Sequence, residues 1–171
     1  TTALQPVYCG AQLLLTGAPK PIDLFFFAVS QEIMTNSSEI QFSVDGPVGR
    51  MHLTKDKSLN SLTQAMCLGM HEHLTKWAAD DAIHAVVVTA EGQRAFCAGG
   101  DVIQVSTAGQ NDPIGAREFF HVEYRMDLAV ANFPKPYICL IDGIVMGGGI
   151  GISVNGSYRV MSEHIMAAMP E

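Results

Sequence analysis

Apolar and polar residues alternate in the first part of the chain that has a clear pattern. Every second residue is apolar from Ile40 to Val44, the turn sequence Asp45-Gly46-Pro47 follows, and alternation resumes from 48 to 53. A period of two is typical of a strand that buries one face, and a turn sequence between two such runs favours a hairpin. We therefore predict a β-hairpin over residues 40–53.

Two later segments repeat their apolar residues every three or four positions, which is the period of an α-helix. The first runs from about Leu62 to Ala79, and Asn60 or Ser61 can cap its start. The second covers residues 113–132 and opens with proline, which is favoured in a first helical turn. The apolar positions are Leu62, Met66, Met70, Leu74 and Trp77 in the first segment, and Phe119, Phe120, Tyr124, Leu128 and Ala131 in the second.

Two continuous apolar runs, Ala85 to Thr89 and Tyr137 to Ile141, are typical of strands buried on both faces. A short helix is expected from Gly148 to about Val154, and a short strand near Tyr158 to Met161. The predicted order is strand, strand, helix, strand, helix, strand, helix, strand. That order indicates a mixed α/β fold.

The first 33 residues differ in composition from the rest. Their apolar run from Leu24 to Val29 is too short to span a bilayer, which needs about 20 residues. They contain no Arg, which a mitochondrial transit peptide would carry. We expect residues 1–33 to be a non-native or unstructured extension and residues 34–171 to hold the folded part, starting at Met34. A native protein that begins before Met34 would contradict this.

Composition excludes some classes of partner. The chain has 171 residues, of which 48% are hydrophobic and 16% charged, as expected for one globular domain with a sizeable core. Its net charge is −7. Nucleic acids and anionic membranes bind through clustered Lys and Arg, so neither is expected as a partner.

Cysteine and histidine positions give no indication of a metal site. The four cysteines lie far apart with no CxxC pair, which favours reduced thiols inside a cell. We favour a bacterial cytoplasm, with a mitochondrial matrix as the alternative. His71 and His73 are two residues apart on a predicted helix and point in different directions, so we expect no metal. Cys97 has no recognisable partner histidine and is expected to be a buried thiol rather than a nucleophile.

Two glycine-rich segments, residues 95–101 and 146–151, each follow an apolar run and precede a helix-like stretch. Glycine lets the backbone approach a ligand closely, and the unpaired N–H groups at a helix start attract negative charge. Two such turns that meet at one point would form an oxyanion hole, in which a pair of amides stabilises a carbonyl oxygen as it gains charge. The alternative is a pair of ordinary strand-to-helix turns.

These segments, together with Met169-Pro170-Glu171 at the end of the chain, resemble the enoyl-CoA hydratase/isomerase (crotonase) superfamily, and within it the 3-hydroxyisobutyryl-CoA hydrolases. The likeness extends from about Ile40 to Glu171 and includes residues 135–137, 143–149, 153–156 and 158–160. It implies an α/β fold of the crotonase ββα spiral type, truncated after the second glycine-rich turn. Members of the family normally continue with a Phe-Pro-Asp segment, whose Asp assists hydrolysis, and a helical region that covers the ligand and often builds oligomer contacts.

The resemblance assigns roles to particular residues. Gly100 and Gly148 match the glycines whose amides form the oxyanion hole. Glu171 matches the carboxylate placed beside the thioester, as nucleophile or as general base, although it is also the terminal residue of this sequence. Glu123 matches an acid that contacts the substrate through its 3-hydroxyl; the alternative is a solvated helix charge. Asp101 is expected to cap the helix that follows Gly100.

Coenzyme A is expected to meet a second group of residues. Lys57, Leu59 and Ala98 lie where the family holds the adenine and pantetheine ends, and Lys55 and Lys57 can supply local positive charge in an acidic protein.

Gly151 departs from the pattern of true hydratases, which usually carry a second Glu three residues after the oxyanion glycine. The missing acid favours thioester hydrolysis over alkene hydration, although a helix-packing glycine explains the residue as well.

The resemblance therefore implies an acyl-CoA thioester hydrolase that converts 3-hydroxyisobutyryl-CoA to 3-hydroxyisobutyrate and CoA, as in valine breakdown. It would need no cofactor beyond the coenzyme A of its substrate, and the full-length protein could form a homo-oligomer. Two alternatives stay open: an enoyl-CoA hydratase or isomerase, and a non-catalytic fragment that binds acyl-CoA. We expect residues 34–171 alone to be weakly active or inactive.

Overall fold

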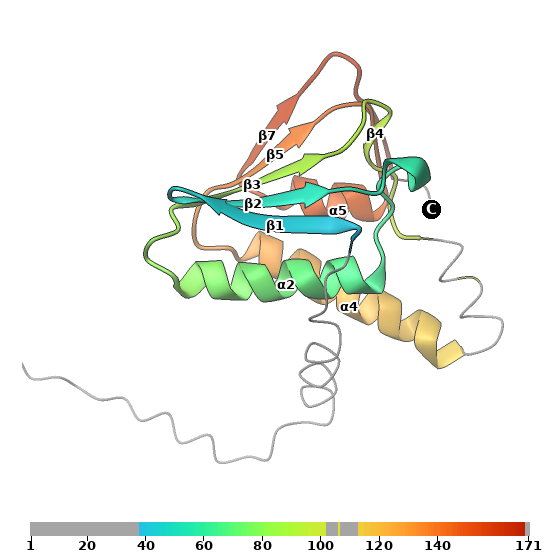
Figure 1. Ribbon diagram of the computed structural model, residues 1–171. Helices are drawn as coiled ribbons and strands as arrows, with labels where there is room; N and C mark the ends of the chain where they lie inside the picture. Colours follow the sequence, from blue (N-terminus) through green and yellow to red (C-terminus); the bar gives the residue numbers. More distant parts are fainter. Residues whose placement is uncertain (1–37, 102–105, 107–112, 170–171) are drawn as a thin grey trace, which may run out of the picture.

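The computed structural model describes residues 38–101, 106 and 113–169 (Figure 1). Most of its strands belong to one mixed sheet, and its helices lie together on one side of that sheet (Figure 1). The elements are β1 (Ile40–Asp45), β2 (Val48–Leu53), η1 (Asp56–Ser58), α2 (Gln64–Ala79), β3 (Ala85–Ala90), β4 (Ala95–Cys97), α4 (Pro113–Ala131), β5 (Tyr137–Ile141), β6 (Ile144–Met146), α5 (Gly148–Val154), β7 (Tyr158–Met161) and β8 (Met166–Ala168).

The main sheet has the strand order β1-β2-β3-β5-β7. β1 and β2 form the predicted antiparallel hairpin, and every later neighbour pairs in parallel. A second sheet, β4-β6-β8, is parallel throughout. Parallel neighbours need crossover connections, and here helices supply several of them. The α/β class predicted from the sequence is confirmed.

The core lies between the main sheet and the helices. β3 is the central strand, and Val86 and Val88 on it are fully buried. α2 packs against α4, and α4 packs against α5. Met66, Met70 and Leu74, from the predicted apolar stripe of the first helix, lie in the same hydrophobic cluster. Because these helices are fixed against one sheet, their loops and ends hold defined positions.

The start of α2 differs from the prediction. Thr63 is the N-cap, and its Oγ1 accepts a hydrogen bond from the Met66 amide. Leu62 precedes the helix and pairs with Gly100 as an isolated parallel bridge. Asn60 is buried, and its Nδ2 donates to the carbonyls of Glu91 and Ala95. Its Oδ1 accepts a hydrogen bond from the Lys55 amide, so it is not available as a cap. The cap was predicted two or three residues too early because several polar residues precede this helix.

The other predicted elements are confirmed, with three strands added. α4, α5, β3, β5 and β7 lie where the pattern placed them, within a residue or so. β4, β6 and β8 were not predicted, and each has three residues. In the described residues, no helix is both long and apolar enough to cross a bilayer.

Candidate functional site

The two glycine-rich segments meet. A side chain at Gly99 would place its Cβ 3.4 Å from the Gly148 nitrogen and 3.1 Å from the Met146 carbonyl oxygen. Gly99 and Gly147 have φ of 106° and 48°, values that side-chain-bearing residues rarely adopt. Glycine is therefore needed at both turns, for backbone geometry and for close approach. The convergence expected from the sequence is present.

Each segment leaves a backbone amide available. Around Gly100, the Leu62 amide donates to the Gly99 carbonyl and the Asp101 amide donates to the Leu62 carbonyl, both at 2.8 Å. This pairing uses the residues on either side of Gly100 and leaves its own N–H without a backbone acceptor among the described residues. Gly148 is the first residue of α5, where an N–H has no acceptor within the helix.

A cavity of about 320 Å³ lies over these glycines. α4 contributes one wall, and the second glycine segment with α5 contributes another. The aromatic rings and both carboxyl groups of the lining come from α4. The lining residues are Gly100, Phe119, Phe120, Glu123, Tyr124, Asp127, Gly147, Gly148, Gly151 and Met169.

Glu123 lies directly against Gly100 and Gly148. A Cβ at position 148 would collide with its Oε1, and a Cβ at Gly100 would lie 3.7 Å from the same atom. The residue is 5% exposed, so the alternative reading as a solvated helix charge is wrong. Burial, and then the nearby charge of Asp127, raise the pKa of the Glu123 carboxyl to about 7. Glu123 can therefore hold a proton at neutral pH.

Asp127 was not predicted as a site residue. It lies one helical turn after Glu123, and a Cβ at Gly151 would lie 2.5 Å from its Oδ2. Burial raises the pKa of its carboxyl to about 6. The absence of an acid at position 151 thus leaves room for an acid from α4. The spacing of four residues between Glu123 and Asp127 was the available signal, because such residues share a helix face.

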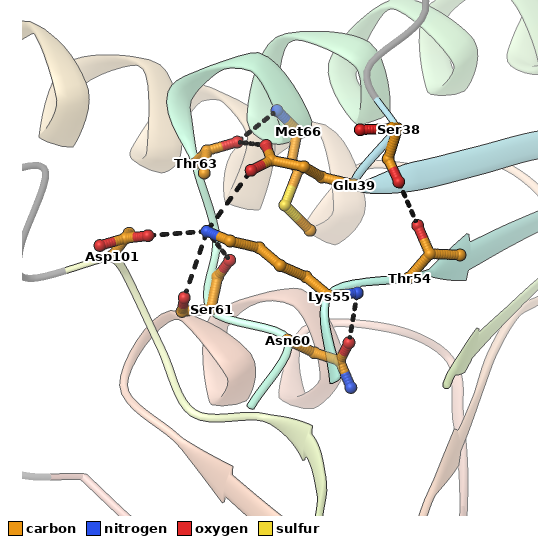
Figure 2. Close-up of polar contacts among 9 residues, drawn as sticks. All are labelled: Ser38, Glu39, Thr54, Lys55, Asn60, Ser61, Thr63, Met66 and Asp101. Carbon is orange, nitrogen blue, oxygen red and sulfur yellow. Dashed lines mark hydrogen bonds and ion pairs between the residues drawn. The ribbon is translucent and has the colours of Figure 1, made fainter. Parts of the chain in front are cut away.

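A polar network behind the first turn fixes its position (Figure 2). Lys55 Nζ lies 2.7 Å from Asp101 Oδ2 and 3.6 Å from Glu39 Oε1. Glu39 Oε2 in turn accepts a hydrogen bond from the Thr63 hydroxyl, so the network joins the turn at Gly100 to the N-cap of α2 (Figure 2). The Lys55 side chain is only 15% exposed. Its charge is used inside the protein and is poorly placed for coenzyme A.

The residues expected to meet coenzyme A lie near one another but outside the cavity lining. The Ala98 amide donates to the Leu59 carbonyl at 3.0 Å, and Lys57 is exposed on η1 in the same loop. Lys57, Leu59 and Ala98 thus lie beside the first glycine turn. Their contact with coenzyme A stays a prediction.

Other expectations have different outcomes. Glu171 lies outside the described residues, as does most of the segment that Asp101 was expected to cap. Cys97 is fully buried, and burial raises the pKa of its thiol to about 12, which confirms a buried thiol. Within the described ranges, no three His, Cys, Asp or Glu side chains gather to hold a metal ion.

The arrangement can bind one polarised oxygen. Two unpaired amides from converging turns can donate to the same carbonyl oxygen, and a protonated carboxyl beside them can donate to a second oxygen. The aromatic walls suit a short apolar chain between these two points.

The chain is similar in sequence to curated relatives and in fold to solved structures. A curated relative from Danio rerio, "3-hydroxyisobutyryl-CoA hydrolase, mitochondrial", is 40% identical over 134 residues, which are 78% of this chain and 35% of that protein. The Homo sapiens protein of the same name is 39% identical over 135 residues, 79% of this chain and 35% of its own length. The chain therefore spans about a third of the length of these relatives.

Among solved structures, a carnitinyl-CoA dehydratase from Mycobacterium thermoresistibile is 41% identical with a TM-score of 0.76, over 80% of this chain and 40% of that one. An enoyl-CoA hydratase from Rhodobacter sphaeroides is 36% identical with a TM-score of 0.74, over 77% and 39%. The sequence pattern of the enoyl-CoA hydratase/isomerase family matches residues 48–171. With both glycine segments and the crotonase-type fold inside that range, the chain belongs to the enoyl-CoA hydratase/isomerase family.

Proposed function

We propose that this chain forms the N-terminal part of an acyl-CoA thioester hydrolase, and that its substrate is 3-hydroxyisobutyryl-CoA, an intermediate of valine breakdown. The observation that carries the proposal is the meeting of Gly100 and Gly148 beside the buried acid Glu123. Relatives named 3-hydroxyisobutyryl-CoA hydrolase support the choice of reaction.

The amides of Gly100 and Gly148 would bind the thioester carbonyl oxygen. When an oxygen nucleophile adds to the carbonyl carbon, that oxygen becomes an anion and its hydrogen bonds strengthen. Collapse of the tetrahedral intermediate breaks the carbon–sulfur bond, and the thiolate of coenzyme A leaves and takes up a proton. The products are 3-hydroxyisobutyrate and free coenzyme A, with one water consumed.

Glu171 is the proposed source of the nucleophile, as the resemblance implies. As a general base it would take a proton from water and return it to the departing sulfur. As a nucleophile it would form an anhydride with the acyl group. One water molecule then cleaves the anhydride and restores the Glu171 carboxylate. Both routes use the same amides and give the same products.

The test is Glu171→Gln in a protein that contains this chain. We expect thiol release to fall by at least about a hundredfold, because the amide is neither a base nor a competent nucleophile, while binding of a non-hydrolysable acyl-CoA thioether is unchanged. Glu163→Gln is the matched control, since the Glu163 side chain is 85% exposed. Full turnover by the Glu171 variant would refute the assignment.

A second candidate is hydration of an enoyl-CoA. The observation that favours it is Asp127, whose carboxylate lies beside Gly151, the position at which hydratases usually carry an acid. A second carboxylate there could help Glu171 to hold a water molecule. Loss of the enoyl double bond without release of thiol would be its signature.

Compartment and partners are also proposals. The curated relatives named above are mitochondrial proteins by name, so they give no support to the bacterial cytoplasm favoured from sequence. We infer a protein that works inside a cell on an acyl-CoA, with a mitochondrial matrix as the compartment that the relatives favour.

A further inference from the structure

Three residues at intervals of four form one row along α4 and line the cavity. They are Phe119, Glu123 and Asp127. Residues at this spacing lie above one another on a helix surface, so the two carboxyl groups are neighbours. Both face the small residues of α5, where Gly148 and Gly151 provide the space that they fill.

The described residues do not satisfy the hydrogen-bonding capacity of either acid. Glu123 is 5% exposed, lines the cavity and accepts no hydrogen bond from the described residues. Asp127 Oδ1 is buried and has no hydrogen-bond partner in the described part of the chain. Buried polar groups are normally paired, so these two acids suit a group that a ligand brings.

Among the described residues, no positive charge acts on the pair. The titratable groups that act on it from the packed elements are thiols and a phenol, and burial keeps each neutral by raising its pKa. They are Cys67 on α2, Cys97 on β4 and Tyr137 on β5. Arg125 is on α4 as well, but helical spacing places it on a different face, where its charge acts on His71.

Two neighbouring carboxylates in such a place cannot both ionise easily. Burial raises the pKa of both carboxyls, and the charge of Asp127 raises that of Glu123 further, to about 7 against about 6 for Asp127. Between about pH 6 and pH 7 the pair therefore holds about one proton, and Glu123 carries most of it.

We propose that Asp127 is a positioning residue that keeps this proton on Glu123, so that the Glu123 carboxyl donates a hydrogen bond to an oxygen on the acyl chain of the substrate. The inference rests on the proposed function. An acyl chain with an oxygen at the position facing Glu123 accepts this hydrogen bond, whereas the corresponding plain alkyl chain leaves the buried acid unpaired. The pair thus selects oxygenated acyl groups such as 3-hydroxyacyl chains.

The direct test needs no turnover. Carboxyl carbon NMR of the labelled chain follows the titration of Glu123 and Asp127 between acid and alkaline pH. We expect Glu123 to titrate near neutrality, and its midpoint to fall by at least about half a pH unit in Asp127→Asn. The asparagine keeps the shape of the side chain and removes only its charge.

Glu118→Gln is the control, because Glu118 is on the same helix but is not in the cavity lining. It should leave the Glu123 midpoint unchanged. An ordinary carboxyl midpoint for Glu123, or the same midpoint in Asp127→Asn as in the unmodified chain, would overturn the proposal.

Turnover by a protein that contains this chain gives a second readout. We expect kcat/KM for a 3-hydroxyacyl-CoA to fall as pH rises through about 7, and Asp127→Asn to move this falling limb to lower pH. Glu123→Gln, whose amide also donates, should abolish the limb. A limb that keeps its position in Asp127→Asn would contradict the role of Asp127. If no protein containing the chain releases thiol, the proposed function fails. The NMR titration still tests whether Asp127 keeps the proton on Glu123.

Discussion

At the scale of single residues, this site depends on glycines, which have no side chain to fill the space beside them. Gly148 and Gly151 leave space into which Glu123 and Asp127 extend from another helix. The sequence predicted the glycines and Glu123, because each stands in a recognisable motif. The sequence did not predict Asp127, because the hydratase pattern places a second acid at position 151, and this chain has glycine there. That an acid on α4 lies beside position 151 of α5 becomes visible only once the fold is known.

The two buried acids also make stability depend on pH. A carboxyl whose pKa is raised by folding binds more protons in the folded state than in the unfolded state between the two pKa values. Unfolding free energy must therefore fall as pH rises from about 4 through about 7, the range between the ordinary values and those of Asp127 and Glu123. At about 1.4 kcal/mol per pKa unit the two carboxyls together give a loss of up to about 6 kcal/mol, measured by urea unfolding at several pH values.

Asp127→Asn provides the control for this dependence. It removes one of the two raised carboxyls and lowers the pKa of the other, so the decline should be about half as large or less. Stability that is flat or rising between about pH 4 and 7 in the unmodified chain would contradict the burial of these acids.

At the scale of elements, local pattern predicted the longer pieces and missed the short ones. The hairpin, α2, α4 and the buried strands β3 and β5 have enough residues to display a period or a continuous apolar run. A strand of three residues has neither. β4 and β6 form because the two glycine segments are brought together, which is a tertiary effect that the local sequence does not encode.

The network around Lys55 joins separate elements and fixes the turn at Gly100 (Figure 2). Lys55→Met would leave the carboxylates of Glu39 and Asp101 without their shared cation in a half-buried place. We expect a loss of about 1–3 kcal/mol in urea unfolding and faster hydrogen exchange at the Asp101 amide.

Lys57→Met is the matched control, because Lys57 is exposed two residues away. It should change unfolding free energy by less than about 0.5 kcal/mol. Equal effects of the two substitutions would show that the network does not hold the turn.

At the scale of the whole molecule, the fold is shown by the solved relatives, whereas the reaction is a proposal. The α/β class followed from the order of elements, and the family resemblance gave the spiral, which the solved relatives support. The proposed substrate rests on the cavity, in which we propose that a carbonyl oxygen and one further oxygen are bound. The chain also spans about a third of the length of its curated relatives, so the reaction of the whole protein is a proposal.

The most direct test of the central claim is a paired assay on a protein that contains this chain. One sample receives 3-hydroxyisobutyryl-CoA and is followed by release of free thiol; the other receives a 2-enoyl-CoA and is followed by loss of its double bond. We predict rapid thiol release in the first and no hydration in the second. Hydration of the enoyl-CoA without thiol release from the hydroxyacyl-CoA would contradict the account.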